Sequence, residues 1–157
     1  MSTIQSEHFT KALFVMLEET FDNVVGIFLD KGTSLFETLA GISAKEASIP
    51  VGGKCATLAA QVKHVAFYLD VTVKSVNDPN FPRVDWMEIW NTVNVVDESE
   101  WQAIQDELRT SYVLIQELIK STPAWSSERE LGGALAVIAH TAYHLGEIRQ
   151  ALCTLRT

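Results

Sequence analysis

The sequence predicts an all-α protein, and three observations lead to that prediction. Apolar residues recur at steps of three and four in four separate segments, as they do on one face of a helix. Capping residues and helix breakers lie between these segments. Apolar and polar residues do not alternate as they do in a half-buried strand. Because each helix has one apolar face to bury, we expect an antiparallel four-helix bundle.

The first expected helix carries an apolar stripe and ends at Lys31-Gly32, a stop signal. The stripe is formed by Phe9, Leu13, Met16, Leu17, Phe21, Val24, Val25 and Phe28. His8, at its start, is expected to be exposed. Residues 35–53 are mixed in character, and Pro50 with Gly52-Gly53 marks them as a connection to the next helix.

The second expected helix covers residues 57–75 and ends where Asn77-Asp78-Pro79-Asn80 and Pro82 break the pattern. Its apolar stripe is Leu58, Val62, Val65, Leu69 and Val73. The link that follows is about 20 residues long, and such links are often functional lids or packed loops. It carries Trp86 and Trp90, which either line the mouth of a pocket or plug the end of the bundle.

Capping boxes predict the starts of the third and fourth helices, since Asp97 precedes Glu100 by three residues and Ser127 precedes Glu130 by three residues. The third helix is expected to end before Pro123 and has the stripe Trp101, Ile104, Leu108, Ile115 and Leu118. The stripe of the fourth is Leu131, Leu135, Ile138, Ala142, Leu145 and Leu152. Gly146 interrupts the fourth helix, where it permits a close helix approach or leaves room for a ligand.

Composition narrows the classes of function. The chain has 157 residues, 47% of them hydrophobic, which suits a single domain over residues 1–157. Its formal net charge is −8 without a compensating basic cluster, so a nucleic-acid partner is not expected. No Gly-rich phosphate loop and no serine nucleophile motif is present, so nucleotide-dependent chemistry lacks support.

The sequence also indicates where the protein works. It begins without a basic leader and contains no apolar run long enough to span a membrane. Its cysteines, Cys55 and Cys153, form no Cys-x-x-Cys pair and are expected as small core or boundary residues. We therefore expect a cytoplasmic protein with no membrane partner.

Two histidines, His140 and His144, lie four residues apart in the stretch AHTAYHLGEIRQ. On a helix their side chains are one turn apart, so both can reach one metal ion at about 2.0 to 2.1 Å. A helical wheel places them on the shoulder of the apolar face, and it places His64 similarly on the second helix, near Gln61. A three-histidine site and three separate half-buried histidines fit this pattern equally well.

Three stretches together resemble the DinB/YfiT-like superfamily of metal-dependent enzymes. They are TLAAQVKHVAFYLD, the loop VDWMEIW followed by DESEW, and HTAYHLGEIRQAL. The resemblance covers most of the chain and is most specific where His-x-x-x-His is followed by Gly and a Gln-Ile or Glu-Ile pair. It implies a four-helix bundle with long crossover loops, a divalent metal held by His64, His140 and His144, and a homodimer. Family members often have Gln at the position of Glu147.

Three neutral imidazoles leave a coordination position open, as in catalytic zinc sites. Zinc or nickel is expected, and iron or manganese also suits the ligands. The resemblance implies a transferase that uses a low-molecular-weight thiol such as mycothiol or bacillithiol, or a related hydrolase, acting on a small molecule. The alternatives are a metal-binding stress or sensing protein without catalysis, and an interaction module that has lost its metal, against which the intact histidines argue.

Two further side chains are candidates for catalytic roles. Glu147, three residues past His144, can orient a metal ligand or accept a proton, although a solvated carboxylate is an equally good interpretation. Tyr68, one turn after His64, can donate a hydrogen bond to a bound anion, or simply extend its hydroxyl into water. Gln61 and Tyr143 have weaker claims.

Overall fold

The computed structural model describes residues 4–53 and 55–156, and within these ranges every regular element is a helix. The long helices are α1 (Ser6–Phe21), α4 (Leu58–Asn77), α6 (Glu98–Ser121) and α7 (Glu128–Leu155). The short ones are α2 (Leu35–Leu39), α3 (Ala44–Ala47), the 3-10 turn η1 (Val51–Gly53) and α5 (Glu88–Thr92). The all-α prediction is therefore confirmed for the described residues.

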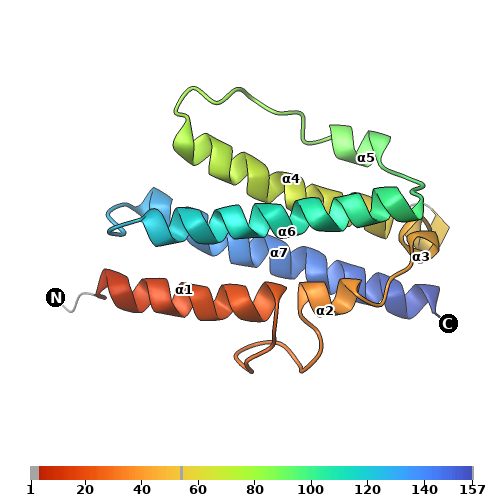
Figure 1. The fold of residues 1–157 in the computed structure, drawn as a ribbon, viewed down its shortest axis with the longest axis horizontal. Coiled ribbons are helices and arrows are strands. Elements are labelled where there is room, and N and C mark those ends of the chain that lie inside the picture. Colours follow the sequence, from red (N-terminus) through yellow and green to blue (C-terminus); the bar gives the residue numbers. More distant parts are fainter. Residues whose placement is uncertain (1–3, 54, 157) are drawn as a thin grey trace.

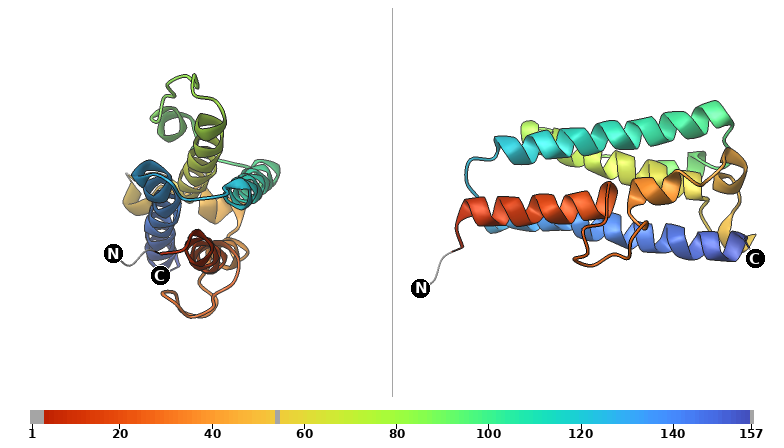
Figure 2. Two further views of the ribbon diagram at one scale, coloured as in Figure 1. Left: turned by 90° about the vertical axis from the view of Figure 1, so that its left-hand side faces the viewer. Right: turned by 60° about the horizontal axis from the view of Figure 1, so that its bottom comes forward.

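The four long helices lie side by side along the length of the molecule (Figure 1). Helix α4 packs against α6 and α7, and α1 packs against the same two helices. Seen from the end, the four axes surround a shared centre (Figure 2). The buried core between them includes Leu17, Phe21, Leu58, Val62, Leu69, Leu108, Ile115, Leu145 and Ile148.

The directions of α6 and α7 differ from the expected antiparallel alternation, because α6 is parallel to α4 and α7 is parallel to α1. Following the colours in Figure 1, α6 runs in the same direction as α4, because the link between them returns along the outside of α4 before α6 begins. Helix α7 then runs opposite to α4. Because α4 and α7 are antiparallel, a step toward the start of α4 corresponds to a step toward the end of α7. This relation determines which residues of the two helices face each other in the site described below.

The capping signals appear where the sequence places them. Asp97 accepts a hydrogen bond from the backbone N–H of Glu100, and Ser127 accepts one from Glu130, each within a complete capping box. At the start of α4, Thr57 Oγ1 accepts the N–H of Ala60 at 3.2 Å. These contacts satisfy backbone donors that have no partner in the first turn of a helix, so the starts of α4, α6 and α7 are defined locally.

Helix α1 is shorter than its apolar stripe predicts. It ends at Phe21 rather than at Phe28, and Val25 and Phe28 are 47% and 41% exposed. The cause is Glu19, which is fully buried. Four backbone N–H groups donate to its carboxylate, from Val25, Ile27, Phe28 and Leu29. The loop after α1 is thus folded around this carboxylate instead of continuing the helix.

Glu19 carries a negative charge despite its burial. Burial raises the pKa of the carboxyl group, but the hydrogen bonds from Ile27, Leu29, Phe28 and Val25 together lower it to about 2. The charged form therefore predominates at neutral pH, where it accepts the backbone donors of the loop.

Four smaller expectations are also corrected. Residues 35–53 are not merely a connection but contain α2, α3 and η1. Leu135, assigned to the buried stripe of the last helix, is 53% exposed. Cys55 and Cys153 are exposed rather than in the core or at its boundary. A Cβ added to Gly146 would meet nothing within 4 Å, so this glycine does not serve a close helix approach.

Two other expectations can be compared with the structure. His8 is exposed, as predicted from its position at the start of α1. In the part of the chain that is described, no helix is both long and apolar enough to cross a membrane.

Candidate metal centre

The three histidines singled out from the sequence lie together between α4 and α7. One ligand atom from each of His64, His140 and His144 can be chosen so that all three atoms are within 4.8 Å of one another. The ring centroids are 5.2 Å apart for His64 and His140, 5.0 Å for His64 and His144, and 4.7 Å for His140 and His144. Of the two possibilities left open by the sequence, the clustered arrangement is the one observed.

Each histidine has a buried ring nitrogen without a hydrogen-bond partner. These atoms are Nδ1 of His64, Nε2 of His140 and Nδ1 of His144. Buried polar atoms are nearly always satisfied in folded proteins. Three such exceptions on adjacent rings fit a cation site, because a cation accepts the lone pairs that no protein donor reaches.

The protonation state of the rings also fits a metal ion. Burial and the nearby His144 lower the pKa of His64 to about 4, and burial with His64 lowers the pKa of His140 to about 4. Burial and His140 lower the pKa of His144. The imidazoles are therefore neutral at neutral pH, which is the form that coordinates a metal.

The spacing of the rings requires only small adjustments for coordination. Two nitrogens bound tetrahedrally at about 2.1 Å are about 3.4 Å apart. The ligand atoms of the cluster lie within 4.8 Å of one another, so rotation of the imidazoles about their side-chain bonds can close the difference. The residues present thus fit a divalent cation held by three imidazoles.

Aromatic side chains surround the cluster. The ring of Trp90 on α5 lies 4.6 Å from that of His64, and Trp86 lies 6.2 Å from it. Tyr68 stacks on His140 at 3.9 Å. Since His64 and Tyr68 are in the middle of α4, the two tryptophans flank the histidines instead of plugging an end of the helix array.

One aromatic contact was missed by the sequence reasoning. The ring of Phe67 packs against that of Trp86 at 5.4 Å, so Phe67 contributes to the same aromatic wall. Its position three residues after His64, next to Tyr68, was a usable signal, because residues three and four apart share a helix face.

Glu147 is the carboxylate closest to the cluster. Its Oε2 lies 3.0 Å from Nδ1 of His144, although the two groups are not in hydrogen-bond geometry, and its side chain is 38% exposed. Tyr143, 64% exposed, places its ring 5.2 Å from that of His144. The carboxylate of Glu147 raises the pKa of the Tyr143 hydroxyl. The sequence candidate Glu147 therefore contacts a histidine and is not simply a solvated surface group.

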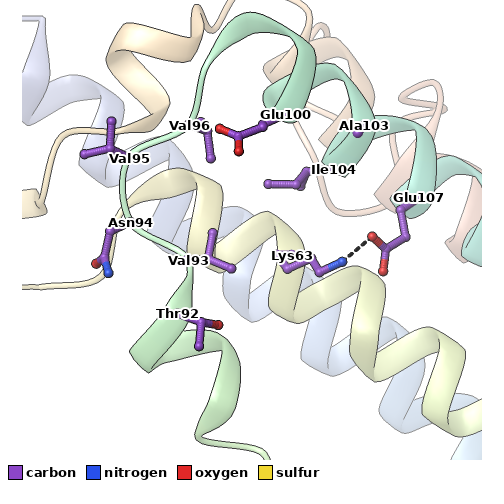
Figure 3. Close-up of a pocket in the computed structure, with 10 residues that line it drawn as sticks. All are labelled: Lys63, Thr92, Val93, Asn94, Val95, Val96, Glu100, Ala103, Ile104 and Glu107. Carbon is purple, nitrogen blue, oxygen red and sulfur yellow. Dashed lines mark hydrogen bonds and ion pairs between the residues drawn. The ribbon is translucent and has the colours of Figure 1, made fainter.

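A surface groove lies on a neighbouring side of α4 (Figure 3). It has a volume of about 280 Å³ and runs between α4, α6 and residues 92–96. Its charged groups are already engaged, since Lys63 pairs with Glu107 and Glu100 accepts the N–H of Asp97. None of the three histidines lines this groove. This groove therefore does not lead to the three-histidine cluster.

Comparison with known proteins returned no match of this chain to a protein family, a curated protein or a solved structure. The site is thus defined by its own geometry.

Proposed function

We propose that this chain is a metal-dependent protein of the DinB/YfiT-like type. In this proposal α1, α4, α6 and α7 form a four-helix bundle with long crossover loops, the link 78–97 among them. A divalent ion, zinc or nickel in the first place and iron or manganese as alternatives, is held by His64, His140 and His144. The observation that supports it most strongly is the convergence of three neutral imidazoles within 4.8 Å.

The donor set determines what such an ion would supply. Held by three neutral ligands, a divalent ion keeps its full charge and an open position, and it lowers the pKa of a bound water or thiol. The chain adds a carboxylate at Glu147 and aromatic walls at Tyr68 and Trp90, which limit the access of water. This combination of a cationic centre and an adjacent base favours an anionic nucleophile at the site.

The reaction proposed is the transfer of a low-molecular-weight thiol to an electrophilic small molecule. The thiol proton passes to Glu147 or to water, a new carbon–sulfur bond forms, and the leaving group departs with the electrons of the broken bond. A related hydrolase would use water in place of the thiol. Tyr68, whose ring contacts His140, is assigned to donate a hydrogen bond to the developing negative charge.

A turnover assay tests this function. The protein is loaded with zinc or nickel and supplied with several small thiols, each paired with an electrophilic acceptor. We expect metal-dependent product with at least one pair, and none from His144→Ala. Stoichiometric metal without turnover in any pair contradicts the enzymatic function and favours the second candidate.

The second candidate is a metal-binding stress or sensing protein without catalysis. The specific observation in its favour is the enclosure of the histidines, because His64 and His144 are only 7% and 6% exposed and Trp90 packs against His64. The two candidates differ in whether an external ligand reaches the metal. The homodimer, the single domain and the cytoplasmic location expected above stay predictions under either candidate.

A further inference from the structure

Gln61 on α4 has a buried polar atom that nothing in the described structure satisfies. The side chain is 8% exposed, and its amide oxygen Oε1 is buried without a hydrogen-bond partner. An unpaired buried acceptor is costly, and in a native protein it calls for a partner that the protein itself does not supply.

The helix geometry places this atom beside the histidine cluster. Gln61 and Tyr68 are seven residues apart, which is two turns of helix, so they lie on the same face of α4 within about 20°. Tyr68 stacks on His140, so this face of α4 is turned toward the histidines of α7. Gln61 precedes His64 by three residues and is therefore about 4.5 Å away from it along the helix axis.

The same register brings Gln61 level with Glu147. Tyr68 is opposite His140, and His64 is opposite His144, so four steps back along α4 match four steps forward along α7. Three further steps from the second pair lead to Gln61 on one helix and Glu147 on the other. The layer next to the histidines thus contains two hydrogen-bond acceptors, one neutral and one charged, from facing helices.

We infer that Gln61 positions the small molecule that binds the metal of this site. Its amide oxygen accepts a hydrogen bond from an N–H or O–H group of that molecule, two or three bonds away from the atom that binds the metal. The inference rests on the proposed metal site and specifies its ligand. A small thiol with a hydroxyl or amine near its sulfur can bind the metal through sulfur and donate a hydrogen bond to the amide oxygen of Gln61 at the same time. A purely apolar thiol leaves the amide oxygen of Gln61 unpaired.

The experiment compares two thiols of nearly equal size, 2-mercaptoethanol and 1-propanethiol, which differ in the hydroxyl group. Each is titrated into the cobalt-loaded protein, and binding is followed by the change in the visible and near-ultraviolet cobalt spectrum. The variants are Gln61→Met, which keeps the length of the side chain, and Gln61→Leu. Gln150→Met, at an exposed position of α7, is the matched control. Cobalt content is measured for every protein.

We expect the preference of the site for 2-mercaptoethanol over 1-propanethiol to fall by about 2- to 12-fold in Gln61→Met and Gln61→Leu, which is the range of one net hydrogen bond. Cobalt content should not change, and Gln150→Met should behave like the wild type. An unchanged preference in the Gln61 variants overturns the role of Gln61 and leaves the metal site intact.

Measurements on the wild type keep the inference falsifiable if both Gln61 variants fail to fold. A wild-type protein that holds cobalt but binds 1-propanethiol and 2-mercaptoethanol with equal affinity contradicts the role of Gln61. One that holds cobalt and binds neither thiol contradicts this role and the thiol chemistry together. A wild-type protein that takes up no cobalt contradicts the proposed metal site itself.

Discussion

The phenol ring of Tyr68 on α4 stacks on the imidazole of His140 on α7, with ring centroids 3.9 Å apart and planes inclined by 24°. This contact joins the two helices that supply the histidines and fixes one of the three rings by packing. The ring and the hydroxyl of Tyr68 therefore have separable roles, because only the ring makes the stacking contact.

Replacing Tyr68 in two ways separates these roles. Tyr68→Phe keeps the stacked ring, so we expect metal affinity to be unchanged while turnover falls about 10-fold or more, the value of a hydrogen bond to a charged acceptor. Tyr68→Ala removes the ring as well and should also weaken metal binding. Metal titration and steady-state kinetics measure the two effects. Equal loss of metal affinity in both variants would contradict the assignment.

Trp90 provides a direct optical signal for metal binding, because its ring lies 4.6 Å from that of His64. Nickel or cobalt should quench tryptophan emission in proportion to the sites filled, and Trp90→Phe should lose part of this change, because Trp86, 6.2 Å from His64, supplies the rest. Trp125→Phe is the control, since Trp125 packs on Phe9 and donates to Thr10 on α1 instead. Equal quenching in the Trp90 and Trp125 variants would place the metal elsewhere.

Glu147→Gln tests the carboxylate that lies 3.0 Å from Nδ1 of His144. The negative charge of this carboxylate lies beside the proposed ion and attracts a cation, so its loss should reduce metal affinity by about 10- to 100-fold. Glu117→Gln, at an exposed position of α6, is the control. Isothermal titration with zinc measures both. An affinity equal to that of the wild type would show that the charge of Glu147 does not contribute to metal binding.

The pH dependence of the metal-free protein follows from the histidines. The pKa of His64 and of His140 is about 4, below the ordinary value of 6.5. Between these values the unfolded chain therefore binds more protons than the folded chain. The free energy of unfolding is therefore highest above pH 6.5 and falls as the pH drops toward 4. Chemical denaturation in the presence of a chelator, at a series of pH values, measures this fall.

The matched comparison uses one histidine of the cluster and the exposed His8. His140→Phe should reduce the pH dependence between 6.5 and 4, with the remainder due to His64, whereas His8→Ala, at an exposed position, should leave it unchanged. Glu19 does not obscure this window, because its pKa of about 2 places the loss of its contribution between pH 4.5 and about 2. A wild-type profile that is flat from pH 7 to 4 would contradict the burial of neutral imidazoles.

Local signals predicted much of the fold. Asp97, Ser127 and Pro123 act within one turn of the helix ends that they define, so the bounds of α6 and the start of α7 could be read directly. The end of α1 could not, because it depends on Glu19 binding backbone N–H groups up to ten residues away. Periodicity describes the faces of a helix and contains no information about such a contact.

The candidate site was predictable to a similar extent. A helical wheel gives the side of α4 or α7 on which each histidine lies, but not the level at which the two helices meet. The meeting of His64 with His144 depends on the direction of α7 and on tertiary packing. The unpaired oxygen of Gln61 is likewise visible only in three dimensions, since no sequence pattern distinguishes it from a solvated amide.

The central claim is that imidazoles from two helices bind one ion, and the metal content of single-histidine variants tests it most directly. We predict one divalent ion per wild-type chain and per His8→Ala chain after loading and desalting, measured by elemental analysis. His64→Ala on α4 and His144→Ala on α7 should each lose nearly all of it. Retention of a full equivalent of metal by His64→Ala would contradict a site shared between α4 and α7.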